Sequence, residues 1–238
     1  MAKSTKNVDW SNPPETLDNH IFYGMDLDAD QRKYRDAIWD EGKRVVFANA
    51  CAGCGKTTIA VLTAALLVKY GIYDDIVYVV PHCGDAQGFL PGTISEKSAV
   101  LFEPLYQALI MGNYDPMRVV NQESIALQQK TGEAFVTAIT DTYLRGSNIG
   151  GSKRTIMIID EAQNATEGAL RKIGTRACES TKVICIGHDL QCDLPDTKRS
   201  GFIRCMNHFN SKGDNRIEIC SLTKNYRGII STTFDEPW

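Results

Sequence analysis

Short apolar runs recur along the 238-residue chain, and each is separated from the next by enough sequence for a crossover helix. Five of these runs are rich in Val and Ile and have the length of buried β-strands. They are residues 44–50, 75–80, 154–160, 182–187 and 216–222. Strands that are apolar throughout and alternate with helices are typical of parallel sheets. The pattern therefore predicts an α/β fold with a mostly parallel sheet and helices on both faces.

Helical patterns flank the first predicted strand. Apolar side chains share one helical face in residues 26–43, where aspartates can cap the beginning and Gly42 can end the helix. Residues 57–71 are rich in strong helix formers and end at Gly71. The order strand, glycine-containing loop, helix is therefore expected around residues 44–71.

Length predicts one domain, because domains usually contain about 100 to 200 residues. Residues 1–20 are polar and include Pro13-Pro14, so we expect a loose N-terminal arm before a domain that covers residues 21–238. The beginning of the chain lacks the apolar core of a secretory signal, and no apolar run reaches the roughly 18 residues needed to cross a bilayer. The expectation is a cytoplasmic protein without a membrane partner.

Charge excludes a global cationic field, because 26 Lys and Arg oppose 29 Asp and Glu, for a net charge of −3. Any contact with nucleic acid must therefore be local. Basic pairs occur at residues 153–154, 171–172 and 198–199, but such pairs are more often solvated surface than a binding track.

Residues 49–58, NACAGCGKTT, allow two interpretations. Cys51 and Cys54 have the spacing of a redox or metal site, and a helix N-terminus would favour a thiolate. A phosphate-binding loop instead needs backbone N–H groups, a lysine and a magnesium-binding hydroxyl at the beginning of a helix. Lys56 and Thr57 supply the last two groups, and the thiol interpretation leaves both unexplained.

The phosphate-loop interpretation is therefore favoured over a redox or zinc site; zinc would need two more ligands, and the chain has no second Cys-x-x-Cys. The expected nucleotide-binding residues are Cys51, Ala52, Gly53, Cys54, Gly55, Lys56, Thr57 and Thr58. One departure is Ala50, which stands where the full pattern has its first glycine.

Asp160-Glu161 follows the most apolar predicted strand. A nucleotide hydrolase needs an acidic residue at the end of a neighbouring strand to hold Mg²⁺ and a carboxylate that orients or deprotonates the attacking water. Asp160 suits the metal, together with Thr57, and Glu161 suits the water. Asp-Glu alone is a weak signal, but its position after a buried strand and downstream of a phosphate loop makes it strong.

Several longer strings resemble those of the PhoH-like ATPases, in the helicase superfamily one branch of P-loop proteins. They are DEAQNAT (160–166), GFLPGTISEK (88–97), FEPLYQAL (102–109) and QCDLP (191–195), and the resemblance spans roughly residues 28–228. It implies a single RecA-like core that hydrolyses ATP with Mg²⁺. Family members are linked by name to phosphate starvation, and some act on RNA.

The resemblance also implies roles for individual residues. Gln31 matches the glutamine that reads the adenine edge, Gln191 the residue that senses the γ-phosphate, and Arg227 the arginine that contacts this phosphate. Residues 143–146 and 175–176 match family positions without a role that we can derive.

Two departures concern coupling and substrate contacts. His188 stands where the family usually has aspartate, and the segment after residue 80 lacks an early arginine. His188 is expected to be a hydrogen-bonded loop histidine rather than a ligand or base.

These observations predict a Mg²⁺-dependent ATP hydrolase with two alternative functions. It is expected to be an ATP-driven motor or remodeller on single-stranded RNA or DNA; alternatively, it is an ATP-dependent switch or sensor that acts through protein partners without nucleic acid. Since few residues follow Arg227, we expect another subunit to close the site in a head-to-tail homo-oligomeric ring, a hexamer by family resemblance. Arg227 would complete its own or its neighbour's site, with Arg176 as the reserve candidate.

Overall fold

A seven-stranded sheet forms the centre of the protein. The computed structural model describes residues 9–81, 100–121, 133–144 and 148–235. The strand order is β3-β4-β2-β5-β6-β1-β7, and every paired neighbour is parallel. The strands are β1 (Val45–Ala50), β2 (Asp75–Val80), β3 (Val120–Asn121), β4 (Val136–Thr140), β5 (Thr155–Ile159), β6 (Thr181–Gly187) and β7 (Ile217–Leu222).

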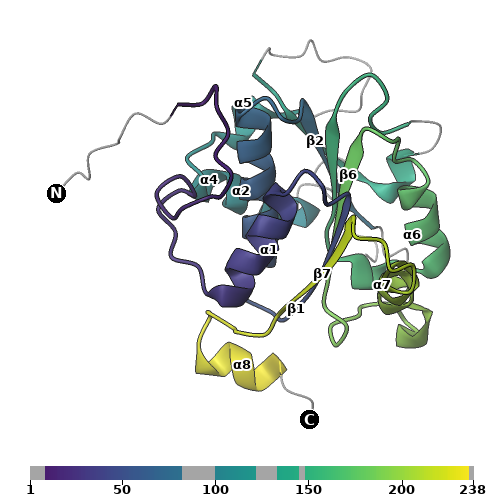
Figure 1. Ribbon diagram of the computed structural model, residues 1–238. Helices are drawn as coiled ribbons and strands as arrows, with labels where there is room; N and C mark the ends of the chain where they lie inside the picture. Colours follow the sequence, from purple (N-terminus) through teal and green to yellow (C-terminus); the bar gives the residue numbers. More distant parts are fainter. Residues whose placement is uncertain (1–8, 82–99, 122–132, 145–147, 236–238) are drawn as a thin grey trace.

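Helices cover both faces of this sheet (Figure 1). One face is covered by α1 (Ala29–Trp39), α2 (Lys56–Lys69), α4 (Glu103–Met111) and α5 (Pro116–Val119). The other is covered by α6 (Glu167–Gly174) and α7 (Phe202–Asn210). Short 3₁₀ turns are η1 (Asp141–Leu144), η2 (Ala162–Asn164) and η3 (Thr197–Arg199), and α8 (Ile229–Asp235) lies apart from both layers. The predicted fold class, a RecA-like parallel sheet between helices, is confirmed.

Burial explains which strands the sequence pattern revealed. All five predicted runs form strands, and every residue of β5 is buried. The pattern missed β3 and β4. The first contains only two residues, and the second, VTAIT, mixes threonine and alanine with two aliphatic residues, so neither is an apolar run.

Helix α1 is shorter than the predicted span of residues 26–43. Asp28 accepts a hydrogen bond from the backbone N–H of Gln31 at 2.8 Å, and the Gln31 side chain accepts one from the Asp28 N–H at 3.1 Å. This capping box fixes the beginning of the helix. The helix ends at Trp39, because buried Lys182 of β6 donates to the backbone carbonyls of Ile38 and Asp40.

The N-terminal segment differs from the expected loose arm over residues 9–20. Leu17 is only 3% exposed, and the Trp10 ring lies 5.0 Å from the ring of Tyr70. The indole N–H of Trp39 also donates to the Pro14 carbonyl at 3.0 Å. Apolar and aromatic side chains within a polar sequence therefore pack this segment against the domain. Residues 1–8 lie outside the described part of the chain.

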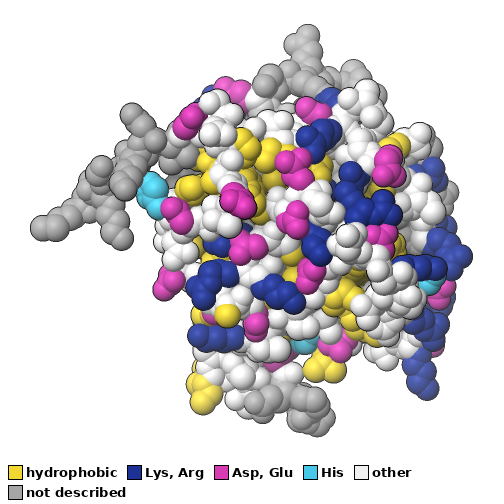
Figure 2. Space-filling view, viewed as in Figure 1, with side chains coloured by type: hydrophobic (Ala, Val, Ile, Leu, Met, Phe, Trp, Pro, Cys, Tyr) yellow, Lys and Arg dark blue, Asp and Glu magenta, His cyan; other side chains and the backbone are white. Residues whose placement is uncertain are grey.

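Acidic and basic side chains are mixed on the face shown in Figure 2, which fits the small net charge. Lysine and arginine side chains gather along the side where Figure 1 draws α6 and α7. None of the helices in the described ranges has the length and apolar character that a bilayer crossing requires.

Candidate nucleotide site

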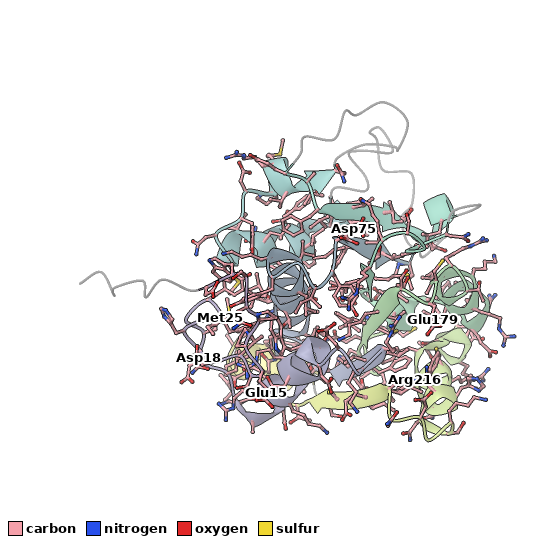
Figure 3. All side chains as sticks on the ribbon, turned by 45° about the horizontal axis from the view of Figure 1, so that its top comes forward. Glu15, Asp18, Met25, Asp75, Glu179 and Arg216 are labelled. Atoms are coloured by element: carbon pink, nitrogen blue, oxygen red, sulfur yellow. The ribbon has the colours of Figure 1, made fainter. Side chains whose placement is uncertain are left out.

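The candidate site lies where β1, β5, β6 and β7 end. Because these strands are parallel, the segments that follow them meet at one edge of the sheet. The opposite edge of the sheet is marked by three residues labelled in Figure 3. Asp75 begins β2, Glu179 comes shortly before β6, and Arg216 directly precedes β7. The predicted phosphate loop and the Asp160-Glu161 pair therefore share the same end of the molecule.

The loop between β1 and α2 has the geometry of a phosphate-binding turn. Gly53 and Gly55 adopt left-handed conformations with φ of 65° and 82°, which strongly favour glycine. Helix α2 begins directly after this turn, at Lys56, so its N-terminal N–H groups face the loop. The Lys56 ammonium lies 3.4 Å from the Ala50 carbonyl and 3.5 Å from that of Cys51.

The position of Ala50 explains why alanine can replace the first glycine of the phosphate-loop pattern. It is the last residue of β1, pairs with Leu222 of β7 and is 1% exposed. A strand residue does not need the conformational freedom of glycine, so alanine fits this position.

Thr57 and Asp160 are in direct contact. The Thr57 hydroxyl donates to Asp160 Oδ2 at 2.8 Å, although the two residues come from α2 and from the end of β5. Asp160 is fully buried, and Tyr78 of β2 donates its hydroxyl to the same carboxylate oxygen at 2.5 Å. Burial and the neighbouring Asp160 raise the pKa of Tyr78 well above its usual value, so this phenol remains a donor.

Sequence reasoning missed Tyr78 as part of the site. It lies in the apolar run DIVYVV, where a tyrosine is typical of the core. The available signal was its position near the end of a buried parallel strand, where a polar tip can reach the site.

Glu161 is held in an unusual conformation beside Asp160. Its φ of 52° is left-handed, and its N–H donates to Asp160 Oδ1 at 2.9 Å. Burial raises the pKa of Glu161, and repulsion from Asp160 adds to this, while Lys56 lowers it. A strained residue with a perturbed carboxyl is typical of functional sites.

Gln163 links Glu161 to the segment after β6, another feature that sequence reasoning missed. Its amide nitrogen donates to Glu161 Oε2 at 2.5 Å, and its amide oxygen accepts from the backbone N–H of His188 at 3.0 Å. Gln163 is 1% exposed, so both bonds are shielded from water. Its position in the quoted string DEAQNAT was the available signal.

The segment after β6 meets the last helix of the described chain. Gln191 Nε2 donates to Asp235 Oδ1 of α8 at 2.7 Å, and His188 Nδ1 lies 3.7 Å from the same oxygen. Asp235 Oδ2 also accepts from the backbone N–H of Ala52 in the phosphate loop at 3.2 Å. Within the described residues His188 Nδ1 is buried without a hydrogen-bond partner, so the expected hydrogen-bonded ring is found only as this longer contact.

Gln31 binds the phosphate loop from α1. Its amide nitrogen donates to the Cys54 carbonyl at 2.8 Å, and the side chain is buried. The Asp28 carboxylate that caps the same helix accepts from the Tyr226 hydroxyl at 2.6 Å. The beginning of α1 therefore contacts both the loop, through Gln31, and the segment that carries Arg227, through Asp28.

Arg227 lies against the phosphate loop of its own chain. A Cβ placed on Gly53 would come within 2.8 Å of Arg227 Cγ, and the Tyr226 N–H donates to the Gly53 carbonyl at 3.0 Å. Arg176, the reserve candidate, follows α6 and precedes β6, so it lies at the opposite edge of the sheet. The two arginines therefore do not meet in one subunit.

The thiols of Cys51 and Cys54 are free and not activated. Burial raises the pKa of Cys51 and raises that of Cys54 to about 11, which disfavours the thiolate that redox chemistry needs. The described residues contain no group of three or more His, Cys, Asp or Glu side chains that could hold a metal. Zinc therefore has no ligand set in this part of the chain.

The donor set fits a Mg²⁺-nucleotide instead. Mg²⁺ prefers oxygen ligands, keeps several waters and needs only one or two carboxylates besides substrate phosphates. Thr57 and Asp160 offer a hydroxyl and a carboxylate side by side at the beginning of α2, next to the glycine turn. The string GFLPGTISEK quoted above lies outside the described residues, and residues 143–146 lie only partly within them.

Fold and loop together define a P-loop protein with a helicase-like core. UvsW helicase from bacteriophage T4 has a similar structure, with a TM-score of 0.52 and 14% identity over 83% of this chain and 60% of that chain. A Dbp5 variant from S. cerevisiae, bound to RNA and ADP BeF3, has a TM-score of 0.50 and 14% identity, covering 93% and 52%. At this identity the likeness shows the fold alone.

Sequence comparison identifies the family. Residues 26–229 match the sequence model described as PhoH-like protein. The chain is 33% identical to Protein PhoH of Escherichia coli (strain K12) over 183 residues, 75% of this chain and 48% of that protein. It is 34% identical to PhoH-like protein of Mycobacterium leprae (strain TN) over 173 residues, covering 72% and 46%. The chain belongs to the PhoH-like protein family and spans about half the length of these curated relatives.

Proposed function

We propose that this chain is a Mg²⁺-dependent ATP hydrolase that works as an ATP-driven motor or remodeller on single-stranded RNA or DNA. The observation that carries the proposal is the 2.8 Å contact between Thr57 and the buried carboxylate of Asp160, beside a glycine turn at a helix N-terminus. This arrangement is what a nucleotide phosphate and its metal require.

Phosphate binding is assigned to residues 51–58. Their backbone N–H groups and the positive end of the α2 dipole favour an anion, and Lys56 supplies a full charge. Within the described residues the Lys56 ammonium has two long contacts, to the carbonyls of Ala50 and Cys51, so it can turn to a phosphate at small cost.

Thr57 and Asp160 are the proposed metal-holding pair. Mg²⁺ bound there would neutralise charge on the β and γ phosphates. Tyr78 keeps the Asp160 carboxylate oriented, since its hydroxyl and that of Thr57 share one carboxylate oxygen. The second oxygen of Asp160 is held by the Glu161 N–H.

Glu161 is the proposed base. The oxygen of a water molecule forms a bond to the γ-phosphorus, the bond to the ADP oxygen breaks, and the water proton passes to the Glu161 carboxylate. The raised pKa of Glu161 suits proton uptake, and Gln163 fixes the direction of the carboxylate.

Three residues are proposed to read the rest of the nucleotide. Gln31 retains one amide N–H and one lone pair beyond its contacts with Cys54 and Asp28, which suits the adenine edge. Arg227 lies over Gly53 and is proposed to reach the γ-phosphate of its own subunit. Gln191 is the proposed γ-phosphate sensor, and its amide now donates to Asp235.

Support for a nucleic-acid partner comes from the local cationic surface near α6 and α7 (Figure 2). Arg171 and Arg204 are 74% and 69% exposed, and both contact Glu167. Lys198 and Arg199 of η3 are also exposed. Exposed cations on one side of an acidic chain can bind phosphates, and the binding then weakens with salt.

The test is steady-state ATP hydrolysis with and without single-stranded RNA and DNA. Stimulation by either strand that disappears at high salt supports the motor. Hydrolysis indifferent to both strands favours the alternative, an ATP-dependent switch that acts through protein partners. Lys56→Ala is the control, and undiminished hydrolysis in this variant would contradict the assigned site.

Assembly is proposed as a head-to-tail ring of identical subunits. Apolar side chains of α8, exposed by 83% at Ile229, 74% at Ile230 and 75% at Phe234, offer a surface for a second copy beside the site. Mass measurement in solution with nucleotide tests the ring, and a strictly monomeric mass with full activity would refute it. Arg227 lies against the phosphate loop of its own subunit. Mixing Lys56→Ala with Arg227→Ala subunits should therefore restore no activity.

A further inference from the structure

Helix α8 places an acidic side chain on the phosphate loop. The helix contains residues Ile229–Asp235 and lies outside both helical layers, beneath β1 and β7 in Figure 1. The side chain of its last residue, Asp235, is only 11% exposed, whereas the apolar side chains of the helix are largely exposed. The helix is therefore attached to the domain by the charged group at its end.

Three groups from two parts of the site surround this carboxylate. Asp235 Oδ2 accepts from the Ala52 N–H at 3.2 Å, and Oδ1 accepts from Gln191 Nε2 at 2.7 Å. His188 Nδ1, which is buried, lies 3.7 Å from Oδ1. A largely buried carboxylate needs such partners, because an unpaired buried charge is costly.

Two of the three groups around Asp235 are ones that the proposed function assigns to phosphate. Ala52 belongs to the phosphate loop, and Gln191 is the proposed γ-phosphate sensor. The Ala52 N–H and one N–H of the Gln191 amide donate to the Asp235 carboxylate, so a phosphate oxygen at this position would have to take these two hydrogen bonds from it. Two anions at this position would also repel each other. Asp235 and the phosphates of a nucleotide bound here would therefore compete for these donors.

Apart from the contacts of Asp235, little in the described structure holds helix α8 against the domain. Ile229, Ile230 and Phe234 are more than 70% exposed, so little apolar area resists its release. The Asn225 amide donates to the Ser231 hydroxyl at 2.9 Å, but both residues belong to the same C-terminal segment. Elements with few buried contacts open at low free-energy cost.

We propose that Asp235 is an autoinhibitory residue that occupies the phosphate site, so that nucleotide binding releases α8. This proposal rests on the proposed function, because it needs ATP to bind at residues 51–58. Without nucleotide, the Asp235 carboxylate accepts the hydrogen bonds of the Ala52 N–H and the Gln191 amide. In the nucleotide-bound state the phosphates take these donors, and α8 with its apolar side chains is freed.

Nucleotide affinity is the first test. Asp235→Ala and the matched control Thr233→Ala are compared with the unmodified chain, using a fluorescent non-hydrolysable ATP analogue with Mg²⁺. The Thr233 hydroxyl donates to the Ile229 carbonyl of the same helix, and its side chain is exposed. We expect Asp235→Ala to bind about 10-fold more tightly, because the apparent dissociation constant falls as the open fraction rises. Thr233→Ala should bind as the unmodified chain does.

Equal or weaker binding by Asp235→Ala, while the unmodified chain binds, would overturn autoinhibition and leave the proposed function intact. If neither chain binds the analogue, the assignment of residues 51–58 fails, and the proposal fails with it. Adding Lys56→Ala to Asp235→Ala should abolish the gained affinity, which places the competition at this loop.

Amide hydrogen exchange supplies a second readout. In the unmodified chain the analogue should speed exchange in residues 229–235 several-fold, because α8 is released. In Asp235→Ala exchange should already be fast without the analogue. Unchanged exchange in the unmodified chain at saturating analogue would contradict the release of α8.

Discussion

The proposed metal-holding residues and the C-terminal segment at residues 223–235 both lie beside the phosphate loop, but they are held in place differently. Thr57, Tyr78 and Asp160 are tied by short hydrogen bonds, and Tyr78 and Asp160 are fully buried. In contrast, Tyr226 is 50% exposed, and α8 contacts the loop through Asp235. The proposed metal-holding groups are therefore fixed in the core, whereas the carboxylate that we propose to exchange with a nucleotide lies on a helix with few buried contacts.

The largest effect is expected at Glu161. Glu161→Gln should bind ATP but hydrolyse it about 10² to 10⁴ times more slowly, because a positioned base is lost. Single-turnover hydrolysis and equilibrium binding separate the two quantities. A variant that no longer binds ATP would assign Glu161 to the structure of the loop rather than to the reaction.

The pH profile provides a related test of Glu161. The base works in its ionised form, so activity should be lost as pH falls through a pKa that burial and Asp160 raise above the ordinary 4.5. The acid limb of kcat/KM in the unmodified chain should therefore lie above pH 4.5, and Glu161→Gln should lack it. An acid limb that persists unchanged in Glu161→Gln belongs to another group.

Two matched tyrosine substitutions sharpen the comparison between the buried and the exposed region. Tyr78→Phe should lower the free energy of unfolding by about 1–3 kcal/mol, since it removes a buried donor from Asp160. Tyr226→Phe removes a hydroxyl that donates to Asp28, yet at this exposed site the loss of stability should be much smaller than for Tyr78→Phe. Denaturant unfolding measures both, and equal losses would contradict the contrast.

The smallest effect is expected for the thiols of the loop. Cys51→Ser with Cys54→Ser should keep substantial ATPase activity, because the loop acts through backbone N–H groups there. Steady-state hydrolysis of the double variant checks this. Turnover that disappears while ATP binding persists would revive the redox interpretation of these two residues.

Local sequence predicted the parts of the site that short segments determine. The glycine turn, Lys56 and Thr57 follow one strand, and Asp160 follows another, so parallel strands bring them together without further information. The role of Tyr78 in the site was not predicted, because a tyrosine in an apolar strand is typical of the core. Asp235 could not be found, since its approach to Ala52, 183 positions earlier, depends on the path of the whole C-terminal segment.

The central claim is that residues 51–58 bind a nucleotide phosphate, and calorimetric titration with MgATP tests it most directly. The unmodified chain should bind saturably, and Lys56→Ala should bind on the order of 100-fold more weakly, because a charge-assisted phosphate contact worth about 3 kcal/mol is lost. Circular dichroism should show an intact fold, since the contacts of the Lys56 ammonium in the described part of the chain are long ones to Ala50 and Cys51. Equal affinity of the two folded chains for MgATP would contradict the account.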